Sequence, residues 1–159
     1  MKKKLNKKEQ ENAFSYFRER FGISRGIFNG LSFFKTKQKI YVVTKDCMQG
    51  SLFDKAETAG LAVLRPNGVL KPTTDALQLF GRYARKNIVK LTKKNAERFI
   101  RGEDLEIDKI EDLKLKAGYV IVRYKEHVLG CANFKQGVLK NMLPKSRRRK
   151  IQGGIWLGR

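Results

Sequence analysis

The sequence predicts an α+β protein, and three observations support that class. Phe14, Phe17 and Phe21 recur at the spacing of one helical face. The segments at 40–44 and 118–124 read IYVVT and GYVIVRY, rich in the β-branched and aromatic residues that favour strands. A hydrophobic content of 41% in 159 residues is enough to bury a core, and the length suits one compact domain or two small ones that share an interface.

The first half is expected to begin with a helix over residues 9–21, and Gly22 is well placed to end it. We expect the aromatic stripe of this helix to pack in the core, with a base-stacking surface as the alternative. Ser24 can cap a second short helix. The apolar residues that this short helix would bury are Ile27, Phe28 and Leu31.

A strand at 39–45 and a hairpin that turns at 66–68 come next. Thr74 can then cap a helix over residues 75–86, whose apolar stripe consists of Ala76, Leu77, Phe80 and Ala84. This pattern leaves Arg82, Arg85 and Lys86 near the carboxyl end of the helix. They can offset the helix dipole, or they can contact RNA.

The second half starts with a strand at 86–92 and a short helix that Thr92 caps and Gly102 ends. Ala96, Phe99 and Ile100 are expected to face inward. The segments at 118–124 and 127–134 then form a hairpin around Lys125 and Glu126, followed by the basic stretch from Leu139 onward.

Charge narrows the possible functions. Against 36 Lys and Arg stand 15 Asp and Glu, which gives a formal net charge of +21. Six of the acids lie between Glu103 and Asp112, whereas Glu126 is the single acid from residue 113 onward. A segregated positive field attracts and orients a polyanion, chiefly nucleic acid. No apolar run approaches the ~20 residues that span a bilayer, and the N-terminus lacks a signal-peptide pattern, so we expect no membrane partner and a cytoplasmic protein.

Residues for catalysis or for cofactor binding do not stand out. Cys47 and Cys131 have no CxxC companion, and His127 is the lone histidine, so no metal site is predicted. Nucleotide-binding glycine loops and nucleophile motifs are missing from the sequence. We therefore expect a protein that is not an enzyme and takes no cofactor.

Four segments resemble known families. Residues 87–105, written NIVKLTKKNAERFIRGEDL, and 118–148 are similar to a PUA domain, the RNA-binding β pseudobarrel. More specifically, GYVIV, LG and LKNMLPKSRR within 118–148 are similar to the C-terminal PUA-like module of RsmF-type RNA methyltransferases. Residues 16–44 resemble the segment before PUA in that group, and residues 71–91 resemble the helix-to-strand junction in both that group and the Nip-type ribosome assembly factors. The resemblance implies a mixed pre-PUA domain at 1–84 and a PUA-like domain at 85–159.

The same resemblance implies binding of structured RNA, expected to be rRNA, by a ribosomal or ribosome-assembly component that can also meet neighbouring ribosomal or assembly proteins. Two alternatives stay open: a subunit that targets tRNA or another RNA to a separate modifying enzyme, and an adaptor whose basic face binds an acidic protein. The methyltransferase catalytic domain has no counterpart here. The RNA-binding residues that we expect are Arg82, Arg85, Lys86, Lys135, Lys140, Lys145, Arg147, Arg148, Arg149 and Lys150. Of these, we expect Lys145, Arg147, Arg148 and Arg149, together with Arg82, Arg85 and Lys86, to line one continuous face.

The C-terminal segment differs from the family in its three consecutive arginines, Arg147 to Arg149. We expect the basic run to begin on a folded strand and to loosen toward 152–159. Ile155 and Trp156 can pack back on the body of the protein, or they can insert into a partner.

Overall fold

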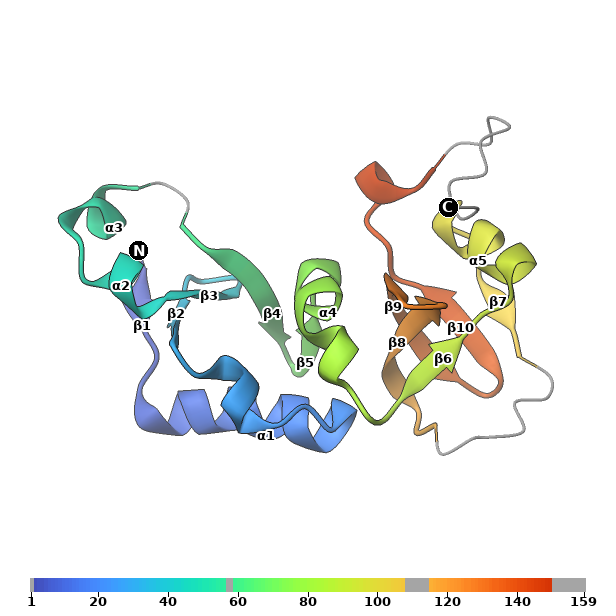
Figure 1. Cartoon of the computed structure of the whole chain (residues 1–159), viewed down its shortest axis with the longest axis horizontal. Coiled ribbons are helices and arrows are strands. Elements are labelled where there is room, and N and C mark those ends of the chain that lie inside the picture. Colours follow the sequence, from blue (N-terminus) through green and yellow to red (C-terminus); the bar gives the residue numbers. More distant parts are fainter. Residues whose placement is uncertain (1, 57–58, 108–114, 150–159) are drawn as a thin grey trace.

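The computed structural model describes residues 2–56, 59–107 and 115–149, which form two sheets side by side (Figure 1). The described part of the first sheet has the strand order β1-β2-β3-β4-β5 and is antiparallel throughout. Its strands are β1 (Lys3–Lys4), β2 (Leu31–Lys35), β3 (Ile40–Thr44), β4 (Leu61–Asn67) and β5 (Val69–Pro72). The described part of the second sheet has the order β6-β8-β9-β10-β7, in which β6 and β8 are parallel. Its strands are β6 (Ile88–Lys90), β7 (Leu105–Glu106), β8 (Gly118–Tyr124), β9 (His127–Lys135) and β10 (Val138–Asn141).

Helix α1 (Lys7–Phe21) lies along the first sheet (Figure 1). Asn6 and Glu9 form a capping box at its start, and Gly22 ends it in the left-handed conformation at φ 65°. Phe17 and Phe21 are fully buried, and Phe14 stacks edge-on against Phe33. The aromatic stripe is therefore core packing, as predicted. Two short helices, α2 (Lys45–Met48) and α3 (Ser51–Lys55), follow β3.

Two predicted helices differ from the observed ones. The segment after Ser24 is a 3-10 turn, η1 (Arg25–Phe28), without a side-chain cap, and Leu31 begins β2 because Gly30 adopts a positive φ and turns the chain into the sheet. Helix α4 (Thr74–Phe80) is capped by Thr73 and not by Thr74, and a 3-10 turn, η2 (Gly81–Tyr83), replaces its predicted last turns.

Gly81 lies where α4 passes into η2. It packs closely against β9, where an added Cβ would lie 3.1 Å from Val128 Cγ2. Two of the predicted inward residues, Leu77 and Phe80, still pack in the core. The predicted apolar stripe is thus confirmed, whereas the predicted end of the helix at residue 86 is wrong.

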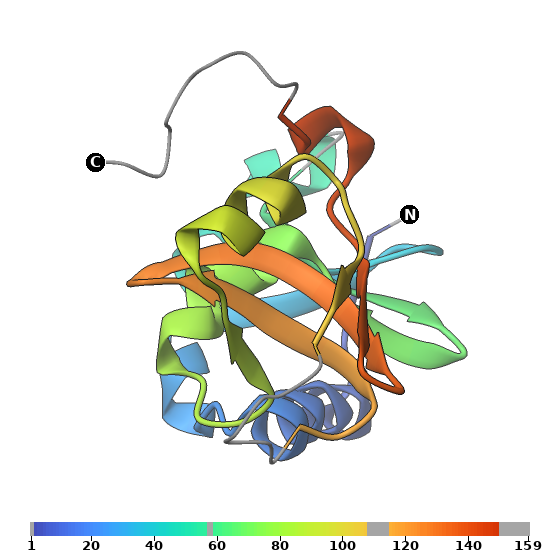
Figure 2. The same ribbon diagram turned by 90° about the vertical axis from the view of Figure 1, so that its right-hand side faces the viewer.

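The second sheet curls around helix α5 (Lys93–Ile100), giving the half-barrel of a PUA-like pseudobarrel (Figure 2). Thr92 caps α5 by accepting a hydrogen bond from the Asn95 N–H, as predicted. Ala96 and Phe99 face the core that lies between α5 and the sheet. The fold is therefore α+β, a mixed first half followed by a PUA-like β pseudobarrel.

The junction between the halves is tightly packed. Helix α4 lies against both β4 and β9, and Leu77 shares a core with Ile121 and Cys131 of the second sheet. The Arg20 guanidinium donates to the backbone carbonyls of Lys116, Ala117 and Tyr119 at 2.7, 3.1 and 2.6 Å. The two halves therefore hold a fixed relation in this structure, and the domain boundary at residue 84 stays a prediction.

Candidate nucleic-acid interface

The arginine run from Arg147 to Arg149 is folded onto the second half. A 3-10 turn, η3 (Lys145–Arg147), follows β10, and the Arg147 N–H donates to the Pro144 carbonyl at 2.8 Å. The Arg149 N–H donates to the Ile100 carbonyl, at the end of α5, at 2.7 Å. The basic run is thus held by backbone hydrogen bonds as far as residue 149.

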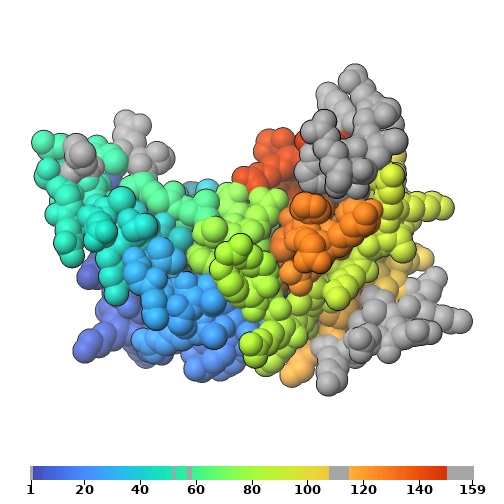
Figure 3. Space-filling model, viewed as in Figure 1, coloured from blue at the N-terminus to red at the C-terminus, as the bar shows by residue number. Residues whose placement is uncertain are grey.

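A cleft of about 440 Å³ opens between α4, the end of α5, the start of β9 and η3. The space-filling view shows the segment around η3, in red, projecting at the top of the second half (Figure 3). We call the cleft the arginine cleft. Its apolar lining consists of Ile100, Val128, Leu129 and Leu143. Its polar lining consists of Gln78, Ser146, Arg147, Arg148 and Arg149. An apolar floor with cationic walls suits a ligand that combines flat apolar surface with negative charge, as a nucleotide does.

Two of these arginines have defined partners. Arg147 forms an ion pair with Asp75 and donates to the Gln78 side-chain oxygen at 3.0 Å, which ties η3 to α4. Arg148 donates from Nε to the Leu143 carbonyl at 3.1 Å. Its side chain crosses Gly102, where an added Cβ would lie 2.5 Å from Arg148 Cδ.

Asn141 supports the cleft from behind. This buried amide donates to the carbonyls of Phe99 and Glu103 at 2.6 and 3.1 Å and accepts from the Leu143 N–H at 2.9 Å. It thereby fixes the end of α5 against the segment that leads into η3. The positions of the cleft arginines depend on this buried hydrogen-bond network.

The other predicted basic residues lie elsewhere. Arg82 is exposed on η2, with its guanidinium 4.7 Å from the centre of the Tyr83 ring. Arg85 and Lys86 are exposed. They lie beside the carboxyl end of α1, where their backbone N–H groups donate to the Phe21 carbonyl at 2.7 and 3.1 Å. Figure 1 shows this end of α1 on the opposite side of the molecule from η3.

Lys135 and Lys140 occupy a third region, the β9-β10 hairpin. Lys140 lies close enough to Lys71 of β5 to affect its ionisation: burial lowers the pKa of Lys71 below its usual value, and the charges of Arg65 and Lys140 lower it further. Lys150, Ile155 and Trp156 lie outside the described residues. Arg85 and Lys86 lie beside α1, away from η3, and the role of the predicted basic residues in RNA binding stays a prediction.

Sequence reasoning missed the uncharged and acidic parts of the cleft. Gln78 and Asp75 lie on α4, and of the apolar residues of the floor Ile100 alone was predicted to face inward from its helix. Gly102 carried a signal, since a glycine after a helix leaves room for a crossing side chain, here that of Arg148. Of the acidic stretch, Glu103 pairs with Arg98 and Asp104 accepts the Asn141 N–H at 2.8 Å, whereas residues 108–114 lie outside the described part.

The described residues offer neither a metal-binding cluster nor a membrane-spanning helix. Among the described residues, no group of three or more His, Cys, Asp or Glu side chains is placed to hold a metal ion. Within the same part of the chain, no helix combines the length and the apolar character needed to cross a membrane.

Comparisons with known proteins agree with this architecture. Residues 86–149 match the family model of the methyltransferase RsmF PUA domain. The structure is similar to that of a conserved PUA domain protein from Thermoplasma acidophilum, with a TM-score of 0.57 and 18% sequence identity over 84% of this chain and 79% of that chain. The search of curated proteins found no match. A PUA domain is in general an RNA-binding module and not a catalytic one. The chain therefore contains a PUA domain that resembles the C-terminal module of RsmF, within a fold shared over most of its length with a PUA domain protein.

Proposed function

We propose that this protein binds structured RNA, specifically rRNA, at the arginine cleft, as a non-catalytic component of the ribosome or of its assembly in the cytoplasm. The observation that carries the proposal is the docking of Arg147 to Arg149 by backbone hydrogen bonds at the mouth of a cleft with an apolar floor. Arginines held in place this way lose less conformational freedom on binding than those of a loose tail.

The charge of the chain fits this ligand. An excess of 21 positive charges makes a polyanion the natural partner. Structured RNA presents phosphates, 2′-hydroxyl groups and shape more than readable base edges, and arginine pairs well with phosphate. Contacts of this kind position a protein but specify little sequence, so the RNA would be selected by its shape and by neighbouring proteins.

Crosslinking of the protein to RNA in cells, followed by sequencing of the bound RNA, tests the proposal. We expect rRNA or its precursors to dominate, with the crosslinks reduced in an Arg147→Gln/Arg149→Gln variant. A Lys7→Gln/Lys8→Gln variant, which loses the same charge from the exposed start of α1, is the matched control. Recovery of tRNA would favour a targeting subunit for a modifying enzyme, and recovery of protein complexes without RNA would overturn RNA binding altogether.

A further inference from the structure

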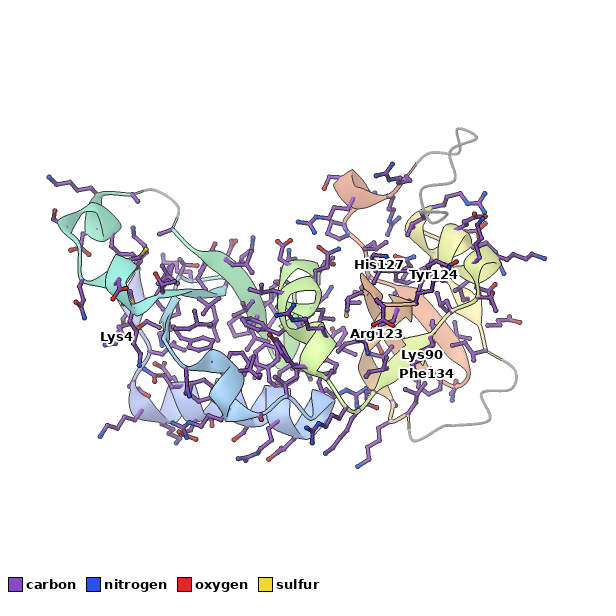
Figure 4. The ribbon with its side chains drawn as sticks, viewed as in Figure 1. Lys4, Lys90, Arg123, Tyr124, His127 and Phe134 are labelled. Carbon is purple, nitrogen blue, oxygen red and sulfur yellow. The ribbon has the colours of Figure 1, made fainter. Side chains whose placement is uncertain are left out.

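A second pair of basic residues lies on the second sheet, outside the set that the sequence pointed to. Lys90 of β6 and Arg123 of β8 are register partners in adjacent parallel strands. Because neighbouring strands run ~4.8 Å apart and register partners point to the same face, the two side chains lie together. Figure 4 shows both residues labelled at the strands that follow the junction with α4.

Arg123 has an unsatisfied donor. Its Nε is buried and has no hydrogen-bond acceptor among the described residues, although the residue as a whole is half-buried. None of the ion pairs within the described part of the chain involves Arg123 or Lys90. A buried donor without an acceptor destabilises a fold, and such groups are rare in native proteins. An anion that accepts from Arg123 would remove this cost.

The backbone shows how Arg123 reaches this position. The pairing of β8 with β9 shifts between Val122 and Arg123, so that Arg123 lies opposite Val128. Bulges of this kind redirect side chains and are frequent beside functional sites. Val128 also lines the arginine cleft, so the strand β9 connects the cleft to the pair, although neither Lys90 nor Arg123 is part of the cleft lining.

The nearby turn is close to neutral overall. Lys125 is exposed, and its ammonium lies 5.4 Å from the centre of the Tyr124 ring. The exposed Glu126 of the same turn offsets the charge of Lys125. The positive charge at this place therefore comes from Lys90 and Arg123 themselves.

We propose that Lys90 and Arg123 form a second phosphate-binding site, which holds a backbone phosphate of the RNA next to the part held in the arginine cleft. This inference rests on the proposed function, because it assigns the path of the RNA away from the cleft. A small rotation of the Arg123 side chain presents Nε and the end of the guanidinium to a phosphate oxygen, while the Lys90 ammonium supplies the second charge.

If this site binds phosphate, replacing Arg123 should raise the stability of the protein and weaken its binding to RNA. Arg123→Met keeps the length of the side chain and removes the unsatisfied donor, so it should raise the melting temperature, by roughly 2 °C or more. The same change should weaken binding to an RNA hairpin about fivefold or more and lower the slope of log affinity against log salt by about 1. If Arg123 had a structural role alone, Arg123→Met would lower the melting temperature and leave RNA binding unchanged.

The experiment compares Arg123→Met, Lys90→Gln, Arg147→Gln/Arg149→Gln and the control Lys8→Gln, each by thermal melting and by titration with one RNA hairpin at several salt concentrations. Inorganic phosphate is a second probe: it should raise the melting temperature of the wild type more than that of Arg123→Met. If the cleft variant loses affinity while Arg123→Met and Lys90→Gln bind like the control, the second site is refuted and the proposed function stands. If the cleft variant and the two pair variants all bind RNA like the control, both the second site and the proposed function are refuted.

Discussion

The two cysteines differ sharply in environment, which gives a test of the core at the scale of single residues. Cys131 is 1% exposed, and burial raises the pKa of its thiol to about 12, whereas Cys47 is exposed on α2. Because the thiolate is the reactive form, Cys131 should resist alkylation at pH 8. We expect one reactive thiol per native chain by mass spectrometry and two in guanidinium chloride.

The Cys47→Ser variant serves as the control for this prediction. It should show no reactive thiol until the protein unfolds. Rapid alkylation of Cys131 in the native variant would mean that the packing of β9 against α4 is not as described.

Asn141 gives a second prediction, on stability. Asn141→Ala removes the partners of two carbonyl oxygens and of the Leu143 N–H, all near the end of α5. Leaving such buried groups unpaired should lower the free energy of unfolding by roughly 2–4 kcal/mol. Urea denaturation measures the change, and Asn12→Ala, at an exposed position of α1, should be close to neutral. Equal effects of the two changes would contradict the network.

At the scale of elements, local patterns predicted most of the fold. The spacing of Phe14, Phe17 and Phe21, the turn at 66–68 and the cap at Thr92 are each encoded within a few residues, and the structure confirms them. The early end of α4 could not be predicted this way, because the segment after Phe80 packs against residues of β8 and β9 that are distant in the sequence. Charge alone likewise could not show which basic residues share a surface, since that depends on where the chain turns between Phe80 and Ile88.

The contact between η3 and α4 yields a prediction about RNA affinity. Asp75 holds the Arg147 guanidinium and places a negative charge at the cleft. Asp75→Asn should therefore free Arg147 and tighten binding of an RNA hairpin, about two- to fivefold, at little cost in stability because exposed ion pairs contribute roughly 0–1 kcal/mol. Fluorescence anisotropy measures the affinity.

Asp46→Asn is the matched control for that variant, since Asp46 is an exposed acid in the first turn of α2 and its loss changes the net charge equally. If both variants bind RNA alike, only net charge matters. Weaker binding by Asp75→Asn would show that Asp75 assists the arginines by holding η3 in place.

The whole molecule carries its positive charge on several sides. The arginine cleft and the end of α1 with Arg85 and Lys86 lie on opposite sides of the molecule. The β9-β10 hairpin with Lys135 and Lys140 pairs with the start of β8, which Arg20 of α1 contacts. We expect a short RNA hairpin to engage the arginine cleft without reaching these other regions. A large folded RNA can wrap around the chain and engage them together.

This arrangement predicts that affinity and salt dependence grow with the size of the RNA. Each neutralised phosphate adds about −0.9 to the slope of log affinity against log salt. A short hairpin that fills the cleft should give a slope of about −3 to −4, whereas a large rRNA domain that also engages two further pairs of basic residues should give a slope steeper by about 4. Because each contact releases counterions, the larger RNA should also bind more tightly at moderate salt.

Variants assign the added slope to its source. Arg85→Gln/Lys86→Gln and Lys135→Gln/Lys140→Gln should leave hairpin binding unchanged and reduce the slope for the large RNA by about 2 each, since each removes two phosphate contacts. Loss of hairpin binding in these variants would place all basic groups on one path and contradict the division into regions. A slope that stays the same for both RNAs would instead confine binding to the arginine cleft, and the charge on the other sides would then serve another partner.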